Sequence, residues 1–150
     1  MSLDPKFMAK LAESSKFELD HIGVAVRTIE EGVSFYRALG FSDYPIEVVE
    51  SEQVKVAFLV CKNQTSIELL EPTKDTSPIA KFLNSRGPGI HHICLRVKGI
   101  EQLAKALKAS GAQLINETPR PGAQGCDVVF VHPKSAGGVL VELSEKRRST

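Results

Sequence analysis

One predicted strand decides the fold of this chain, and it reads Ile90-His91-His92-Ile93-Cys94-Leu95-Arg96-Val97. β-Branched residues recur in it, and a Gly-Pro-Gly turn at 87–89 stands directly before it, which is typical of a β-strand. An earlier stretch has the same character: Leu19-Asp20-His21-Ile22-Gly23-Val24-Ala25-Val26. Residues 20–22 align with residues 91–93, and the alignment continues through half of the chain. The sequence therefore predicts an internal repeat.

The repeat extends through a helix and the glycine that ends it. Thr28 is a predicted N-cap, and the apolar residues that follow it recur at helical spacing. The offsets are the same in both copies: Ile29 and Gly40 lie eight and nineteen residues after His21, and Ile100 and Gly111 lie eight and nineteen residues after His92. Two shared offsets indicate a duplicated strand–helix unit.

Each copy then continues in predicted strands, at 44–49, 54–60 and 66–70 in the first and at 112–116, 128–131 and 139–143 in the second. The expected fold is α+β: two paired βαβββ modules (17–72 and 89–145) in a single domain (17–145). They would form a cupped mixed sheet with helices on the convex side. The linker 73–88 carries a predicted helix at 78–84. Residues 1–16 form an N-terminal arm, expected to be a short helix or partly disordered.

Composition excludes several classes of protein. The chain has 150 residues, 42% of them hydrophobic and 25% charged, and a formal net charge of +1. Its Lys and Arg residues are scattered, so no nucleic-acid or membrane surface is predicted. The three cysteines are far apart and lack a CxxC pair, which favours a reducing compartment, here taken as the cytoplasm.

Two glutamates interrupt apolar strands at matching places in the repeat. Glu68 lies between Ile67 and Leu69, 47 residues after His21, and Glu142 occupies the corresponding place 50 residues after His92. A carboxylate buried in a strand is costly unless it is paired or binds a cation. A pseudo-twofold axis would bring His21, Glu68, His92 and Glu142 together. Imidazole and carboxylate ligands suit a divalent transition metal.

Other candidates carry weaker signals. Cys94 should face the cup as a small filling residue. The stretch 118–125 is expected to form a mobile flap beside the cup, and Arg120 in it is a candidate contact for an anionic substrate. Lys134 and Ser135, in the loop of the last hairpin, are candidate substrate contacts of the same kind.

Residues 19–26, 67–72, 89–93, 132–134 and 138–143 resemble the methylmalonyl-CoA epimerases, a family of the vicinal oxygen chelate (glyoxalase and bleomycin-resistance) superfamily. The resemblance implies a homodimer and a divalent metal, cobalt first, with zinc, nickel or manganese as alternatives. It implies that His21, Glu68, His92 and Glu142 are the ligands, and that the (R) and (S) forms of an acyl-CoA substrate, methylmalonyl-CoA, are interconverted. Some members carry a base where this chain has Val56, so Glu68 and Glu142 are the candidates for acid–base catalysis.

Three alternatives stay open. A glyoxalase I-type lactoylglutathione lyase uses a similar ligand set, but it usually has an arginine where this chain has Ala25. An iron dioxygenase of the superfamily uses two histidines and one glutamate, which leaves Glu68 unexplained. A metal-free binding or resistance protein would need none of the four ligands. Strand alternation also predicts that His91 turns away from His92, towards the helix side, as packing or hydrogen-bonded support.

Overall fold

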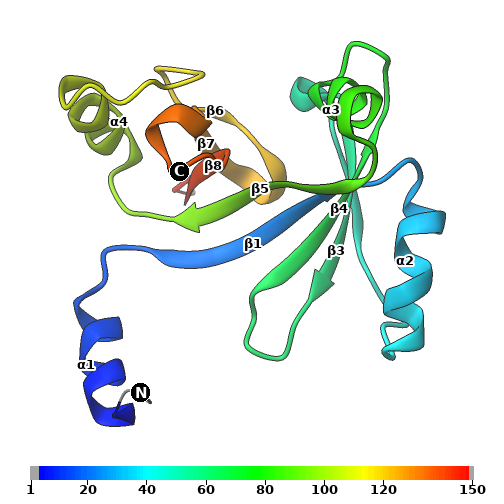
Figure 1. The fold of residues 1–150 in the computed structure, drawn as a ribbon, viewed down its shortest axis with the longest axis horizontal. Coiled ribbons are helices and arrows are strands. Elements are labelled where there is room, and N and C mark those ends of the chain that lie inside the picture. The colour runs from blue at the N-terminus through cyan, green and yellow to red at the C-terminus, as the bar shows by residue number, and fades with distance from the viewer. Residues whose placement is uncertain (1–3, 149–150) are drawn as a thin grey trace.

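The computed structural model describes residues 4–148, whose strands form an eight-stranded mixed sheet (Figure 1). Its helices are α1 (Pro5–Ser14), α2 (Ile29–Ala38), α3 (Pro78–Arg86) and α4 (Ile100–Ala109), with short 3₁₀ turns η1 (Glu50–Glu52), η2 (Ala123–Gly125) and η3 (Pro133–Ser135). Its strands are β1 (Glu18–Ala25), β2 (Ile46–Val49), β3 (Val54–Val60), β4 (Ser66–Pro72), β5 (Gly89–Arg96), β6 (Arg120–Pro121), β7 (Cys126–Val131) and β8 (Val141–Lys146).

The two copies of the repeat meet at the centre of the sheet. The strand order is β2-β3-β4-β1-β5-β8-β7-β6, so each half contributes a run of four strands. The first strands of the two halves, β1 and β5, pair antiparallel, while β4 and β8 run parallel to their neighbours β1 and β5. The order therefore mirrors itself about the β1–β5 pair. The prediction of two modules joined edge to edge in a cupped sheet is confirmed.

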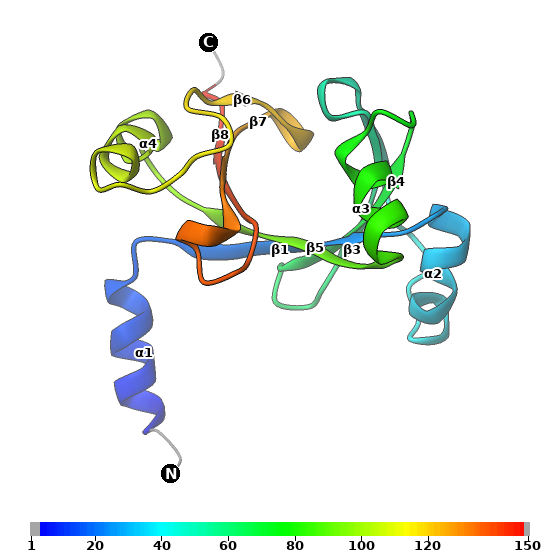
Figure 2. The same ribbon diagram turned by 45° about the horizontal axis from the view of Figure 1, so that its top comes forward.

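Alternation along the strands separates two faces. On the convex face, α2 packs over a cluster that includes Val33, Leu59 and Leu69, and α4 packs over one that includes Ala104 and Val129. Both helices lie outside the curve of the sheet (Figures 1 and 2).

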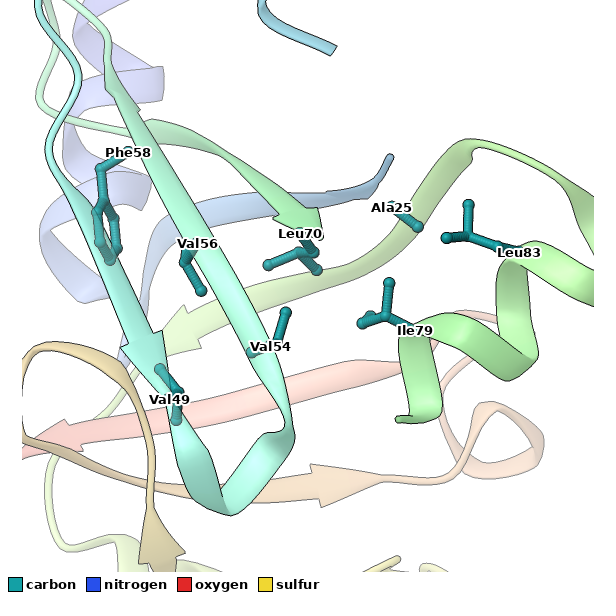
Figure 3. Close-up of a cluster of buried hydrophobic side chains, with 8 residues drawn as sticks. All are labelled: Ala25, Val49, Val54, Val56, Phe58, Leu70, Ile79 and Leu83. Atoms are coloured by element: carbon teal, nitrogen blue, oxygen red, sulfur yellow. The ribbon is translucent and has the colours of Figure 1, made fainter. Parts of the chain in front are cut away.

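The third helix corrects the expectation that all helices lie on the convex side. Ile79 and Leu83 of α3 pack against Val54 and Leu70, which point to the concave face (Figure 3). The α3 helix begins at Pro78 after the N-cap Ser77, whose hydroxyl oxygen accepts a hydrogen bond from the Ile79 amide at 3.1 Å. The linker thus covers part of the cup instead of passing behind it.

The second half departs from the predicted strand at 112–116. In place of a strand, this segment forms an isolated β-bridge between Leu114 and Val131. The strand at the edge of the sheet is β6, which pairs with β7. The Asn116 side chain takes over part of the ladder: its amide nitrogen donates to Val128 O at 2.9 Å, and its oxygen accepts from Phe130 N at 2.8 Å. The Asn116 side chain thus forms hydrogen bonds with the backbone of β7 that a regular neighbouring strand would otherwise form. The predicted flap at 118–125 therefore contains the edge strand β6.

Within the N-terminal arm, the described residues Pro5–Ser14 form the helix α1, and residues 1–3 lie outside the part of the chain that the structure describes. Asp4 caps this helix by accepting from the Lys6 amide at 3.1 Å, and Pro5 occupies the first turn. None of its residues is buried, and it stands away from the sheet (Figure 2). Within residues 4–148, no helix has the length and apolar character needed to cross a membrane.

Candidate metal and active site

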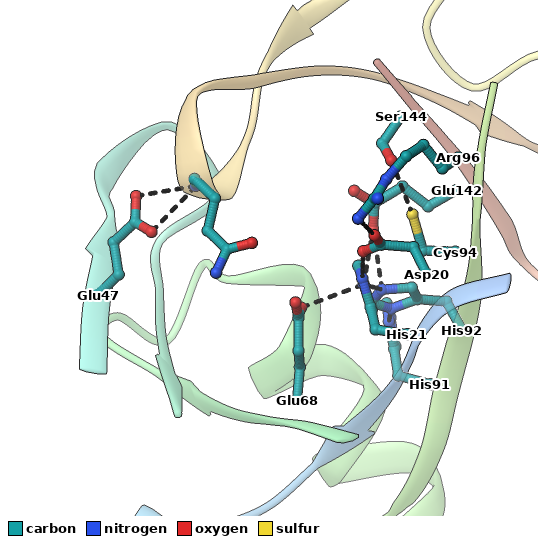
Figure 4. A network of polar contacts seen from close by, with 11 residues as sticks. Asp20, His21, Glu47, Glu68, His91, His92, Cys94, Arg96, Glu142 and Ser144 are labelled. Atoms are coloured by element: carbon teal, nitrogen blue, oxygen red, sulfur yellow. Dashed lines mark hydrogen bonds and ion pairs between the residues drawn. The ribbon is translucent and has the colours of Figure 1, made fainter. Parts of the chain in front are cut away.

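A cavity of about 180 Å³ lies on the concave face of the sheet. Its walls are largely apolar and include Val54, Leu70, Ile79 and Phe130. A cluster of buried histidine and carboxylate side chains also lines it (Figure 4). An apolar cavity with a few convergent polar groups is the usual form of a small-molecule site.

The structure brings the four predicted metal ligands together in this cavity. His21 Nε2 lies 3.1 Å from Glu68 Oε2 and 3.1 Å from His92 Nε2. Glu142 Oε2 lies 2.9 Å from His92 Nε2 and 3.5 Å from His21 Nε2. The four side chains come from the four central strands, β4, β1, β5 and β8, one from each. His21, His92 and Glu142 offer ligand atoms within 4.8 Å of one another, and Glu68 joins this cluster through its contact with His21.

The strand register explains the convergence. Glu68 is paired opposite Gly23, two residues after His21, and Glu142 is paired opposite Cys94, two residues after His92. Residues two apart on a strand share a face, so each glutamate lies on the face of its own histidine. The two halves use the same register, as the repeat in the sequence indicates.

Each histidine of the cluster, His21 and His92, is preceded by the extra residue of a β-bulge. In the pairing of β1 with β5, Leu19 and His21 are opposite two consecutive residues of β5, so Asp20 is an extra residue on β1. On β5, the extra residue is His91. A bulge redirects a side chain that strict alternation would send to the opposite face. Asp20 Oδ2 accepts a hydrogen bond from His21 Nδ1 at 2.7 Å, and His91 Nδ1 lies 3.0 Å from His92 Nδ1.

These two neighbours set the orientation of the ligand rings. Since Asp20 accepts the Nδ1 proton of His21, the Nε2 atom of His21 is left to face the other ligands. His91 supports His92 as expected, but it lines the cavity and its ring packs on Phe82 of α3, with centroids 5.1 Å apart. The prediction that His91 turns away from His92 is therefore wrong, because the bulge cancels the alternation and α3 itself covers the concave face.

Gly23 gives the His92 ring the space it occupies. A Cβ atom built on Gly23 would lie 2.3 Å from His92 Cε1 and 2.6 Å from His92 Nδ1. Any side chain at this position would overlap the ring, so the absence of a side chain on β1 is a requirement of the site.

The buried charges of the cluster are tightly coupled. Burial raises the pKa of Glu68 to about 7. Burial lowers the pKa of His21, but its hydrogen bonds, first of all to Asp20, outweigh this effect and raise the pKa overall. Burial also opposes ionisation of Glu142, yet hydrogen bonds from His21 and His92 lower the pKa of Glu142 to about 2. The cluster thus holds protons that balance two desolvated carboxylates, and a divalent cation could replace these protons. The donor set fits such an ion.

Cobalt(II) affinity is expected to rise with pH through about 7. Metal binding needs ionised carboxylates and neutral imidazoles, so the cation competes with the protons that Glu68 and His21 hold. Below the pKa of a group that must lose its proton, each decrease of one pH unit makes the dissociation constant for cobalt about tenfold larger for every proton that the metal displaces. Titrations followed by visible absorption at about pH 6 and about pH 8 measure this slope. Equal affinity at both values would contradict the protonated state of the metal-free cluster.

The remaining predicted residues separate into two groups. Arg120 lines the cavity, and its Nε atom forms an ion pair with Glu52 Oε1 at 2.8 Å. Lys134 and Ser135 are exposed in η3 and are not among the residues that line the cavity. The Ser135 hydroxyl oxygen accepts from the Gln113 amide at 2.9 Å, which holds the loop.

Cys94 faces the cavity side of β5 and is fully buried. Burial raises the pKa of its thiol to about 11, so the thiol stays protonated.

The sequence alone did not identify Asp20, Glu52 or Gly23 as site residues. The sequence did carry a signal for Asp20, because the repeat aligns it with His91, and each of the two directly precedes a predicted ligand histidine. Glu52 had none, since its partner Arg120 is 68 residues away in the sequence.

Comparison with known proteins agrees with this geometry. The family model described as Glyoxalase/Bleomycin resistance protein/Dioxygenase superfamily matches residues 20–130. A mitochondrial methylmalonyl-CoA epimerase of Dictyostelium discoideum is 42% identical over 86% of this chain and 78% of that protein. The methylmalonyl-CoA epimerase of Mycobacterium tuberculosis has a TM-score of 0.82 at 35% identity, covering 90% of this chain and 92% of the other.

A further neighbour carries a ligand. A Streptomyces coelicolor methylmalonyl-CoA epimerase variant in complex with 2-nitronate-propionyl-CoA has a TM-score of 0.79 at 34% identity, covering 89% of this chain and 100% of the other. The similarity to both solved structures extends over about nine-tenths or more of each chain. This chain belongs to the glyoxalase/bleomycin resistance protein/dioxygenase superfamily and, within it, to the methylmalonyl-CoA epimerase family.

Proposed function

We propose that this protein is an epimerase that interconverts (R)- and (S)-methylmalonyl-CoA by removing and returning the proton at C2. The observation that carries the proposal is the convergence of His21, Glu68, His92 and Glu142 on one face of an otherwise apolar cavity. Membership of the epimerase family supports the choice of substrate.

We infer that these four side chains hold a divalent metal ion. The donor set of two imidazoles and two carboxylates supports cobalt, with zinc, nickel or manganese as alternatives. When bound, such an ion would act as a Lewis acid towards the oxygens of the substrate, which stabilises the charge that develops as the C2 proton leaves. Asp20 and His91 would hold the two imidazole rings in place for it.

Glu68 and Glu142 are the proposed acid–base pair. An epimerase needs one group to take the C2 proton on one face and another to return a proton on the opposite face. Val56 lines the cavity where some family members carry a base, and an alkyl side chain cannot do this work. Burial raises the pKa of Glu68 to about 7, which suits a group that exchanges a proton at neutral pH. Glu142 Oε2 faces His21 from the other half of the sheet, and hydrogen bonds from His21 and His92 lower its pKa, so that it is ionised and is the candidate acceptor of the C2 proton.

The apolar walls have a second role. They exclude water from the carbon that loses its proton, and a low-dielectric site strengthens the electrostatic contribution of each polar group. Arg120 lies at this wall and is the proposed contact for an anionic part of the substrate. Lys134 and Ser135 stay predictions, restricted to parts of the substrate outside the cavity.

We also propose a homodimer that works in a reducing compartment such as the cytoplasm. Exposed apolar side chains on α1, on β1 and in the segment between them, among them Phe7, Leu11, Phe17 and Leu19, support an interface. The three cysteines are free thiols, which supports a reducing compartment. Light scattering coupled to size-exclusion chromatography measures the mass, and a monomer at working concentration would contradict the dimer.

Enantiopure (S)-methylmalonyl-CoA tests the function directly. The cobalt-loaded protein is expected to abolish the circular dichroism of the C2 centre, since epimerisation ends in a mixture of both forms. A persistent signal would contradict the proposal. Turnover of the methylglyoxal–glutathione adduct in its place would identify a glyoxalase I-type lyase.

A further inference from the structure

The proposed ligand His92 depends on the residue that precedes it (Figure 4). His92 Nε2 faces the cluster, 2.9 Å from Glu142 Oε2 and 3.1 Å from His21 Nε2. For this nitrogen to offer a lone pair to a cation, the neutral ring must carry its proton on Nδ1. The atom placed to accept that proton is His91 Nδ1, 3.0 Å away. The orientation of the His91 ring therefore helps to decide which nitrogen of His92 is available to a metal ion.

Strand pairing does not fix the orientation of His91. It is the extra residue of the bulge on β5, so it has no residue paired opposite it on β1. The χ2 torsion of a histidine is also broad, since it joins an sp³ carbon to a planar ring. Packing against another side chain must therefore hold the His91 ring in the plane from which Nδ1 reaches His92.

The linker helix α3 supplies that packing. The Phe82 ring lies 5.1 Å from the His91 ring, measured between centroids, at an interplanar angle of 80°. Two rings prefer such an edge-to-face arrangement, and it restricts the rotation of both. The Arg86 guanidinium carbon lies 5.6 Å from the centroid of the Phe82 ring and covers it in turn. His91 thus contacts one ring on α3 and the His92 ring on its own strand, with centroids 5.2 Å apart.

The α3 helix is itself anchored to the first half of the sheet. Ile79 and Leu83 belong to the buried cluster shown in Figure 3, which is built on strands of the first half. The helix ends at Gly87, whose positive φ of 73° favours glycine, and β5 begins two residues later. This short connection places Phe82 over the start of β5, where His91 lies. A side chain of the linker therefore joins the core of the first half to a proposed metal ligand of the second.

We propose that Phe82 is a positioning residue for the metal site and that it acts on His92 through His91. The inference rests on the proposed function, because it takes His92 as a metal ligand, and it deepens that function. The repeat places a supporting residue before each histidine of the cluster, but the ring that holds His91 comes from the linker, outside the repeat. Phe82 is not among the residues that line the cavity. Its replacement should therefore affect the metal without removing a contact to the substrate.

Cobalt(II) affinity, measured by competition with a chelator, tests the role of Phe82. Phe82→Leu keeps an apolar side chain and loses the ring, so it is expected to weaken cobalt binding about 3- to 10-fold, the contribution of one aromatic pair. Phe82→Tyr keeps the ring and should stay within about twofold. Phe35→Leu is the matched control and should change nothing, because it breaks an edge-to-face pair with Tyr36 on the convex helix α2. Unchanged affinity in Phe82→Leu, or an equal loss in Phe82→Tyr, would overturn the proposal.

A second variant separates an action through His91 from a general loss of packing. His91→Leu removes the acceptor of the His92 proton, and loss of such a partner typically weakens metal binding about 10- to 100-fold. Phe82→Leu should add nothing in this background, since two residues that act through one contact are not independent. An additive loss would show that Phe82 acts through the core and not through His91, and the proposal would be wrong.

The Nδ1 protons of the two histidines provide a signature that a general loss of stability would not move selectively. NMR of the zinc-loaded protein, whose d¹⁰ ion is diamagnetic, can follow the His92 proton beside His91 and the His21 proton held by Asp20. Phe82→Leu is expected to speed the exchange of the His92 proton with water and to leave the His21 proton unchanged. Equal behaviour of the two protons would contradict the positioning role. A protein that shows this dependence on Phe82 but exchanges no C2 proton of methylmalonyl-CoA would refute the proposed function alone.

Discussion

Glu142→Gln is expected to lower the rate of C2 proton exchange about 10²- to 10⁴-fold, the usual range for a lost acid–base group. Glu142 Oε2 lies 2.9 Å from His92 Nε2 and 3.5 Å from His21 Nε2, and an amide at this place cannot take up a proton. The amide is close in size to the carboxylate, so the core should pack as before. Deuterium uptake at C2, followed by NMR, measures the rate.

The matched control is Glu101→Gln, an exposed carboxylate in the first turn of α4, which should leave the exchange unchanged. Metal content must be measured for both variants, since Glu142 is also a proposed ligand. A metal-loaded Glu142→Gln variant that exchanges within about threefold of the unmodified rate would contradict the catalytic role of Glu142, because a threefold loss is far smaller than the loss expected for an acid–base group.

Gly23→Ala is expected to remove most of the metal affinity, by about 100-fold or more. The new Cβ would lie 2.3 Å from His92 Cε1, so the ring must move by roughly 1 Å, and a displacement of that size at a preorganised site costs about two orders of magnitude. Overpacking of a buried site also lowers the free energy of unfolding, by about 1–3 kcal/mol. Cobalt titration and thermal unfolding measure the two effects.

Gly89→Ala on the neighbouring strand β5 provides a matched control. A Cβ at Gly89 would meet nothing within 4 Å, and Gly89 is paired with Ala25 across the same strand pair. This variant should keep both the metal affinity and the stability. Cobalt binding by Gly23→Ala that equals that of Gly89→Ala would show that the position of the His92 ring does not depend on Gly23.

The internal repeat made the centre of this molecule predictable from its sequence. Equal offsets after His21 and His92 predicted two modules, and the matching places of Glu68 and Glu142 predicted four converging side chains. The structure brings these four residues together through two equivalent strand registers. The alternation of side chains along a strand is enough to predict this convergence, because each glutamate needs only to lie on the same face of the sheet as the histidine of its own half.

Local departures from that period could not be predicted. Bulges at Asp20 and His91 bring both residues to their neighbouring histidines, where strict alternation would turn them away. The side chain of Asn116 replaces ladder hydrogen bonds in the second half, which removed the expected strand at 112–116. A bulge depends on the pairing of two strands far apart in sequence, and one strand read alone gives no sign of it.

Contacts between the two halves were equally hidden. The Glu52–Arg120 pair joins the 3₁₀ turn after β2 to the edge strand β6. Charged residues in loops are usually solvated, so nothing in either segment predicted that the two side chains form an ion pair at the cavity wall. The position of α3 on the concave face has the same origin, since its amphipathic pattern does not tell which apolar surface it covers.

Deuterium exchange in D2O tests the central claim most directly, because it follows the proton that the site is proposed to move. The cobalt-loaded protein is expected to replace the C2 proton of methylmalonyl-CoA with deuterium. His92→Ala, which removes a proposed ligand 3.1 Å from His21 Nε2, is expected to lose this exchange. Absence of deuterium at C2 with the metal-loaded protein would contradict the account. So would undiminished exchange by His92→Ala.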